Sequence, residues 1–100
     1  MIVVNQEFKY RNESDRALDV VYASVTAREI TRFDVLLVTE DGKSVQVDCV
    51  YAGAGGSHSW WSASGGKMLG PEFPNGLPPN ATLIIRGNTK ETAIRVDFFP

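Results

Sequence analysis

The stretch that decides the fold is ITRFDVLLVTEDGKSVQVDCVY, residues 30–51. Its first part, residues 30–38, is rich in β-branched and aromatic residues, which favour strands. Asp41-Gly42 follows and supplies the positive φ angles that a tight hairpin turn requires. We therefore predict two antiparallel strands joined by a turn at residues 40–43.

The alternation after the turn assigns the next residues to the two faces of a strand. Gln46 and Asp48 fall on one face, and four residues share the other: Val45, Val47, Cys49 and Tyr51. Free cysteine is commonly buried, whereas a reactive thiol needs a basic, exposed setting. We therefore expect Cys49 to point into the core. As the only cysteine, it cannot form a disulfide within the chain.

The rest of the chain carries the same period-two pattern in shorter pieces. Two segments of the first third are predicted strands, with the apolar residues Phe8, Tyr10, Leu18, Val20 and Tyr22. Between them, residues 12–15 favour a turn, and we expect a hairpin that begins a meander. Two final strands are predicted at 81–86 and 92–99, with Leu83, Ile85, Ile94, Val96 and Phe98 on their apolar faces.

These patterns predict seven or eight short strands and no helix that could connect parallel strands. One hundred residues, 43% of them hydrophobic, are enough for one ordinary core. The predicted fold class is all-β, an antiparallel β-sandwich of jelly-roll or Ig-like type forming a single domain over residues 1–100. The nearest alternative is an open, six-stranded barrel.

One long segment, residues 52–81, differs in composition from the rest. Half of its positions are Gly, Ser or Pro, and only Lys67 and Glu72 are charged. A structureless loop of this length is uncommon inside a compact domain, so we expect a short strand near residues 59–62 to divide it. Four prolines in its second half favour an ordered, extended path.

Charge and hydropathy narrow the classes of partner. The net charge is −2, and the ten basic residues are interleaved with twelve acidic ones, so the clustered cations that bind nucleic acid are missing. No apolar run approaches the roughly 18 residues of a membrane span, and the first residues lack the pattern of a secretion signal. We expect a chain that is cytoplasmic at synthesis and binds neither nucleic acid nor membrane.

Motifs for catalysis and metal binding are weak. His58, the only histidine, lies between Ser57 and Ser59, but sequence neighbours on an extended chain point to opposite faces. Ser64 and Lys67 have a Ser-x-x-Lys spacing, yet the two glycines between them oppose the helix that this motif needs. One histidine and one cysteine cannot build a four-ligand zinc site. We expect no enzymatic activity, no cofactor and no metal.

The pair Trp60-Trp61 is the feature that remains. In an extended segment the two indoles project to opposite sides, so one can enter the core while the other stays near the surface. One or both could simply pack in the core, as large aromatics usually do. An exposed indole could instead anchor a protein interface or stack on a sugar ring. The candidate binding residues are those of this loop: His58, Trp60, Trp61, Lys67, Met68 and Phe73.

A proline-rich approach, Leu77-Pro78-Pro79-Asn80, leads into the predicted strand 81–86, a turn and a final strand at the end of the sequence. This layout resembles small sandwich proteins of tailed-phage particles. The resemblance covers the last quarter of the chain and transfers no site residues. It implies a capsid decoration or cement protein, or a neck or tail component, that forms a symmetric oligomer.

We therefore expect a non-enzymatic structural or interaction protein. Its expected partners are copies of itself or a larger scaffold such as a capsid or tail, reached through residues 52–81 and the sheet edges, which would incorporate the chain into a virion. The alternative is a carbohydrate-binding module that uses Trp60 or Trp61 as a stacking platform. A small hydrolase with an unrecognised site is a third hypothesis.

Overall fold

The computed structural model describes residues 2–4, 6–53, 57–61, 73, 76–89 and 91–98. Every regular element in that part of the chain is a strand, and the prediction of an all-β chain with antiparallel pairing is confirmed. The strands are β1 (Ile2–Val4), β2 (Glu7–Arg11), β3 (Val20–Ala27), β4 (Thr31–Val38), β5 (Ser44–Ala52), β6 (Ser57–Trp61), β7 (Thr82–Gly87) and β8 (Thr92–Phe98).

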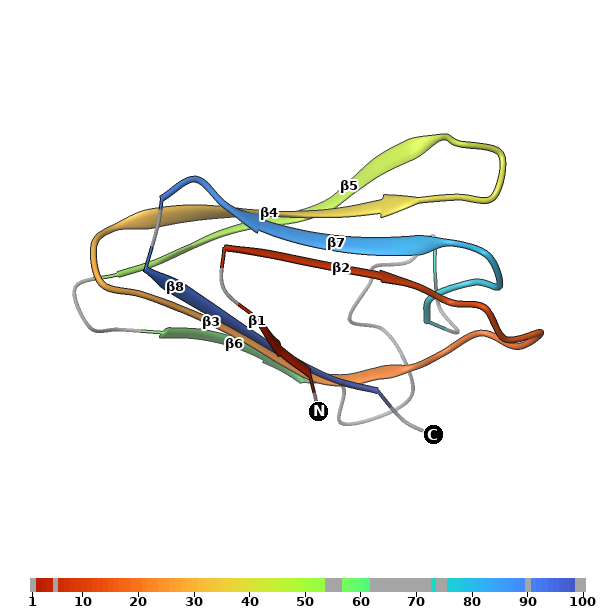
Figure 1. Ribbon diagram of the computed structural model, residues 1–100, viewed down its shortest axis with the longest axis horizontal. Helices are drawn as coiled ribbons and strands as arrows, with labels where there is room; N and C mark the ends of the chain where they lie inside the picture. Colours follow the sequence, from red (N-terminus) through yellow and green to blue (C-terminus); the bar gives the residue numbers. More distant parts are fainter. Residues whose placement is uncertain are drawn as a thin grey trace.

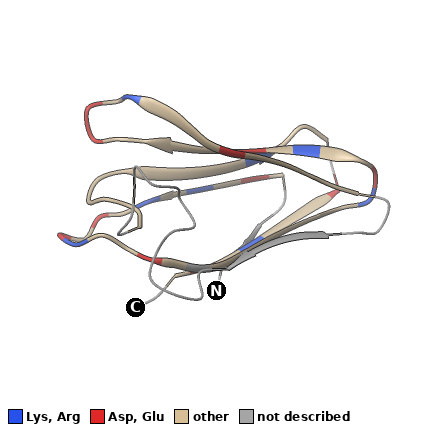
Figure 2. Cartoon of the chain, turned by 180° about the vertical axis from the view of Figure 1, so that it is seen from behind, with Lys and Arg blue, Asp and Glu red and all other residues tan. Residues whose placement is uncertain are grey.

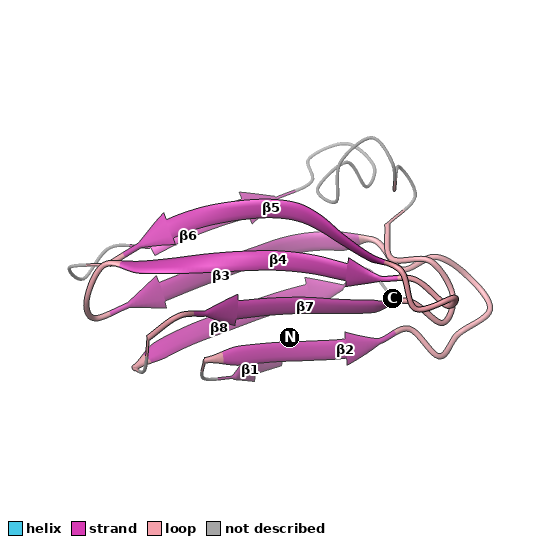
Figure 3. Ribbon diagram, turned by 90° about the horizontal axis from the view of Figure 1, so that it is seen from above, coloured by secondary structure: helices cyan, strands magenta, loops and turns pink. Residues whose placement is uncertain are grey.

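These strands form two four-stranded sheets that lie one over the other (Figure 1). Sheet 1 has the order β1-β8-β3-β6, and sheet 2 has the order β2-β7-β4-β5. Seen from above, the strands of one sheet follow those of the other in two layers (Figure 3). Each sheet therefore has an inner face toward its partner and an outer face.

The strand pairs follow a nested pattern. β4 pairs with β5, β3 with β6, β2 with β7 and β1 with β8, all antiparallel. The chain is thus arranged like one long two-stranded ribbon that is folded over at the β4–β5 turn. Two further pairings, β3 with β8 and β4 with β7, join the ribbon's parts into sheets.

The turn at the tip of this ribbon is the one that the sequence predicted. Gly42 has a φ of 86°, and its N–H donates to the carbonyl of Thr39 at 2.9 Å. The N–H of Thr39 in turn donates to the carbonyl of Lys43 at 2.9 Å. The predicted hairpin at residues 12–15 is wrong, because β2 and β3 on either side of it belong to different sheets.

The core lies between the sheets and receives side chains from both. Phe8, Leu83 and Ile85 of sheet 2 and Ile94 and Val96 of sheet 1 are buried, as the alternation predicted. Aromatic rings connect the two layers at one end, since the Phe8 and Phe98 centroids lie 6.3 Å apart. The remaining buried members of the core are Val20, Ala23, Val25, Ala27, Phe33, Val35, Leu37, Val50, Ala52, Leu77 and Ala81.

Two β-bulges change the face on which the following residues lie. In β3 the register with β8 shifts between Val20 and Tyr22. In β5 the register with β4 shifts at Val47, because Gln46 pairs with Leu36 and Asp48 pairs with Val35. An extra residue on one strand shifts the alternation of every residue beyond it. The expectation that Tyr22, Cys49 and Tyr51 share the inner face is therefore wrong. Instead the buried positions beyond the bulges are Ala23, Val25, Ala27, Val50 and Ala52.

Asn12 links the β2–β3 connection to the segment before β7 by hydrogen bonds of its side chain. Its side chain is fully buried, and Nδ2 donates to the carbonyl of Arg16 at 2.7 Å and to that of Leu77 at 2.9 Å. Its Oδ1 accepts hydrogen bonds from the backbone N–H and the hydroxyl of Ser14. Both donor hydrogens and the acceptor of the amide are thus used, which is what a buried amide needs.

We predict that Asn12→Ala lowers the free energy of unfolding by about 2 kcal/mol or more, because two carbonyls each lose one donor and the N–H of Ser14 loses its acceptor. The melting temperature should fall by roughly 10 °C. Asn88→Ala is the matched control, since Asn88 is exposed and its Oδ1 accepts a hydrogen bond from the N–H of Arg32. Equal losses in the two variants, measured by thermal unfolding, would contradict the role given to Asn12.

Candidate functional site

Among the described residues, the large hydrophobic side chains left exposed are those of Ile30, at 76%, and Tyr51, at 62%. They belong to the same end of sheet 2, because Thr31 pairs with Ala52 and Arg32 pairs with Tyr51. We call Ile30, Arg32 and Tyr51 the Tyr51 patch. Exposed apolar residues that gather in one place are typical of contact surfaces.

Backbone packing fixes this end of the sheet. Gly53 follows β5 with a φ of 158°, and a Cβ added there would lie 2.4 Å from the Cα of Ile30. Only glycine permits so close an approach. The two chain segments that carry Ile30 and Tyr51 are therefore held against each other.

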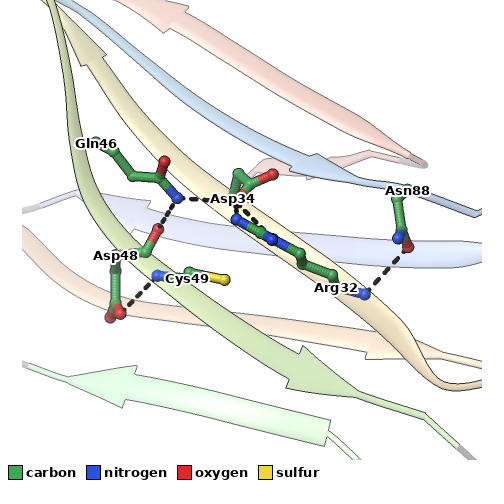
Figure 4. Close-up of polar contacts among 6 residues, drawn as sticks. All are labelled: Arg32, Asp34, Gln46, Asp48, Cys49 and Asn88. Atoms are coloured by element: carbon green, nitrogen blue, oxygen red, sulfur yellow. Dashed lines mark hydrogen bonds and ion pairs between the residues drawn. The ribbon is translucent and has the colours of Figure 1, made fainter.

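A polar network holds Arg32 in place (Figure 4). Its Nε donates to Oδ1 of Asp34 at 3.0 Å, and Gln46 Nε2 donates to the same oxygen at 2.8 Å. The hydrogen bond and the charge of Asp34 both raise the pKa of Arg32. The backbone N–H of Arg32 donates to Oδ1 of Asn88 at 3.1 Å. The guanidinium is thus held in an ion pair with Asp34, on the strand position that pairs with Tyr51.

The Cys49 thiol is exposed, and the expectation that it lies in the core is wrong. The bulge in β5 is the physical reason, because it moves Cys49 from the inner to the outer face. On that face Cys49 pairs in register with Asp34. The thiol therefore lies next to the polar network.

The accessibility of the Cys49 thiol can be measured directly. We predict that a disulfide reagent such as dithionitrobenzoate labels the native chain at a rate within about tenfold of that of the chain unfolded in guanidinium chloride. The unfolded chain is the control for full access. Labelling of the native chain at the much slower rate of global unfolding would show a buried thiol and contradict the bulge.

Asp48 protects the free edge of sheet 2. The N–H of Cys49 donates to Oδ1 of Asp48 at 2.7 Å, and the carboxylate lies on the side of β5 that faces away from β4 (Figure 4). β5 is the last strand of its sheet, and Asp48 is its only charged residue. A bulge and a charge are common protections of an edge strand against uncontrolled pairing.

We predict that Asp48→Ala increases non-specific aggregation, because an edge N–H loses its acceptor and β5 loses its charge. Dynamic light scattering after incubation would measure it. Glu7→Ala is the control, since it removes a carboxylate from β2, the opposite edge strand of the same sheet. Equal aggregation of both variants would mean that net charge, and not the β5 edge, sets the effect.

The outer face of sheet 1 carries a second cluster. The guanidinium carbon of Arg95 lies 5.2 Å from the centroid of the Tyr22 ring, and Arg95 Nη2 forms an ion pair with Asp97 Oδ2 at 3.1 Å. The alternation around the fully buried Ala23 and Val25 places Tyr22 and Ser24 on this outer face. The cluster results from the bulge in β3.

The structure describes only some of the binding residues that the sequence predicted. Lys67 and Met68 lie outside the described residues. Phe73 is partly buried and packs against the core. The backbone of β6 is described, and it pairs His58 with Val25, Trp60 with Ala23 and Trp61 with Tyr22.

Of the predicted binding residues, His58, Trp60 and Trp61 therefore share one strand, β6, which pairs with β3. The Tyr51 patch and the Arg95–Tyr22 pair were not predicted from the sequence. Strict alternation placed both tyrosines on the inner face, and no residue type in the sequence marks the two bulges. The exposed charge of Arg32 and Arg95 was the only signal available.

An open hollow of about 560 Å³ lies between the β4–β5 turn and the segment before β7. The Thr39 hydroxyl and the N–H of Lys43 donate to Asp41, and these bonds lower the pKa of that carboxyl. The hollow is lined by Thr39, Glu40, Asp41, Lys43, Pro78, Pro79 and Ala81.

Within the described ranges, no three His, Cys, Asp or Glu side chains are grouped as metal ligands. The described residues form no helix, and hence none that could cross a bilayer. No family model, curated protein or solved structure matches this chain.

Proposed function

We propose that this chain is a non-enzymatic structural subunit, built on a jelly-roll sandwich, that assembles with copies of itself as in a phage particle. The nested pairing of β4 with β5, β3 with β6, β2 with β7 and β1 with β8 supports the fold, because a jelly roll is such a ribbon wrapped into two sheets. Viral coat subunits are among the proteins that use it.

The observation that carries the proposal is the Tyr51 patch. Tyrosine and arginine are enriched among the residues that dominate the energy of protein interfaces, and apolar area adds to them. The Arg32 guanidinium is already held by Asp34, so little side-chain entropy is lost when a partner arrives. The patch therefore combines apolar area with a fixed ion pair.

Charge distribution supports a protein partner. Basic and acidic residues interleave along the strands and turns (Figure 2). Ion pairs such as Arg86–Glu7, at 2.7 Å, and Arg32–Asp34, at 3.0 Å, neutralise cations of sheet 2 locally. A surface of this kind favours contacts of mixed polarity over a phosphate backbone.

We include residues 52–81 in the proposed contact surface because half of these positions are Gly, Ser or Pro. The last part of this segment is firmly attached, because Leu18 and Leu77 exchange backbone hydrogen bonds of 2.9 and 2.7 Å. Gly76 lies against this bridge with a φ of 97°. Such attachment favours a docking segment over a hinge, since less order is gained on binding.

Sedimentation velocity over a concentration series tests the assembly. We predict a self-associating chain, in which Tyr51→Ser and Ile30→Ser each weaken association by about tenfold or more. Both side chains are exposed, so the fold should tolerate the changes.

Lys9→Ser is the control, because it shortens an exposed side chain on the outer face of β2, at the opposite edge of the same sheet. It should leave association unchanged. A wild-type chain that stays monomeric up to about 1 mM would contradict the proposal. Equal weakening by Lys9→Ser would place the interface elsewhere.

A further inference from the structure

The outer face of sheet 1 is a second surface, distinct from the Tyr51 patch. We propose that it binds neutral glycans, with Tyr22 and Arg95 as the platform and the neighbouring hydroxyls as hydrogen-bonding groups. This inference goes beyond the proposed assembly and uses the opposite face of the molecule. We call Tyr22, Ser24, Thr26, Arg95 and Asp97 the Tyr22 face.

The register brings these residues into a compact arrangement on two central strands. Ser24 of β3 pairs with Arg95 of β8, and Tyr22 pairs with Asp97. Thr26 pairs with Ala93, so the side chains of Ser24, Thr26 and Ala93 beside the platform are all small. A flat surface with hydroxyl groups next to an aromatic ring suits a pyranose, which has an apolar face and polar edges.

The platform is already assembled without ligand. Arg95 lies over the Tyr22 ring at 5.2 Å and is also paired with Asp97 at 3.1 Å. Arg95 is 46% exposed, which leaves polar atoms of its guanidinium accessible, whereas Asp97 is 23% exposed and its Oδ1 is buried. Preorganised polar groups lose less entropy when they bind a ligand.

Charge decides in favour of a neutral ligand. The outward residues of β3 and β8 in the described chain carry one cation, Arg95, and one anion, Asp97, which neutralise each other. A phosphate or an acidic peptide would have to separate this pair. Hydroxyl groups can bond to both members and keep the pair intact.

The polarity of the face disfavours a protein as its occupant. The two large hydrophobic side chains that the described residues leave exposed, Ile30 and Tyr51, both lie near sheet 2. Apart from the half-buried Tyr22, the Tyr22 face presents small or polar groups. Protein interfaces concentrate apolar and aromatic area at their centre, which this face does not supply.

The test is a titration of the full 100-residue chain, labelled with ¹⁵N, with neutral hexasaccharides of glucose, N-acetylglucosamine, mannose and galactose. We expect saturable shifts for at least one hexasaccharide, centred on the amides of Tyr22, Ser24, Thr26, Arg95 and Asp97. Arg95→Ala should weaken that binding by about tenfold or more.

Arg86→Ala is the matched control. Arg86 is also an outward arginine on a central strand, 52% exposed and paired with Glu7, but it belongs to sheet 2. It should change the affinity by less than about twofold. The absence of saturable shifts with all four sugars, shifts centred on sheet 2, or equal weakening by both variants would each overturn the proposal.

A further measurement separates this inference from the proposed assembly. Arg95→Ala should sediment like the wild-type chain. If it instead abolished self-association, the Tyr22 face would be a protein interface and the glycan proposal would be wrong. Loss of association in Tyr51→Ser with intact sugar binding would support both surfaces independently.

Discussion

One inserted residue in β3 and another in β5 determine which side chains this fold presents to its surroundings. Without the shift between Val20 and Tyr22, the tyrosine would point into the core and no ring would lie under Arg95. Without the shift beside Val47, Cys49 and Tyr51 would do the same. Both candidate surfaces therefore depend on backbone irregularities, which proteins often use to redirect a side chain.

The bulges are compatible with a close-packed core because of the residues that replace the tyrosines. Ala23, Val25 and Ala52 are small, so the inner face gains little volume where a bulge lies. Larger side chains fill the core elsewhere, and each needs a small residue opposite it. Phe33 is fully buried opposite Gly87, where a Cβ would lie 2.9 Å from the phenyl ring. Large and small residues thus interdigitate across neighbouring strands.

Local patterns were sufficient to assign the faces of a regular strand, and to assign its partner only where that partner is close in sequence. The Asp41-Gly42 turn and the buried faces of β7 and β8 were predicted correctly. The turn at residues 12–15 was misassigned because β2 pairs with β7, so that Arg11 meets Thr82, 71 residues later. No local signal distinguishes a turn within a sheet from one that crosses to the other sheet.

The candidate surfaces were the least predictable part for a related reason. Trp60 and Trp61 drew attention by composition, whereas Tyr22 and Tyr51 looked like ordinary core residues in an alternating strand. Their exposure depends on register, and register is set by contacts between distant strands. Asp48 shows the same limit, since its role at the edge depends on the bulge that precedes it.

The two proposed surfaces are also compatible with each other in one assembly. Sheets that pack face to face are separated by roughly 10 Å, so a partner on sheet 2 leaves the outer face of sheet 1 open. Copies joined through the Tyr51 patch would then present several Tyr22 faces at once. Binding through many linked sites is stronger than binding through one, because each contact after the first is intramolecular. A weak affinity of the single face for a sugar would therefore be enough for the assembled particle.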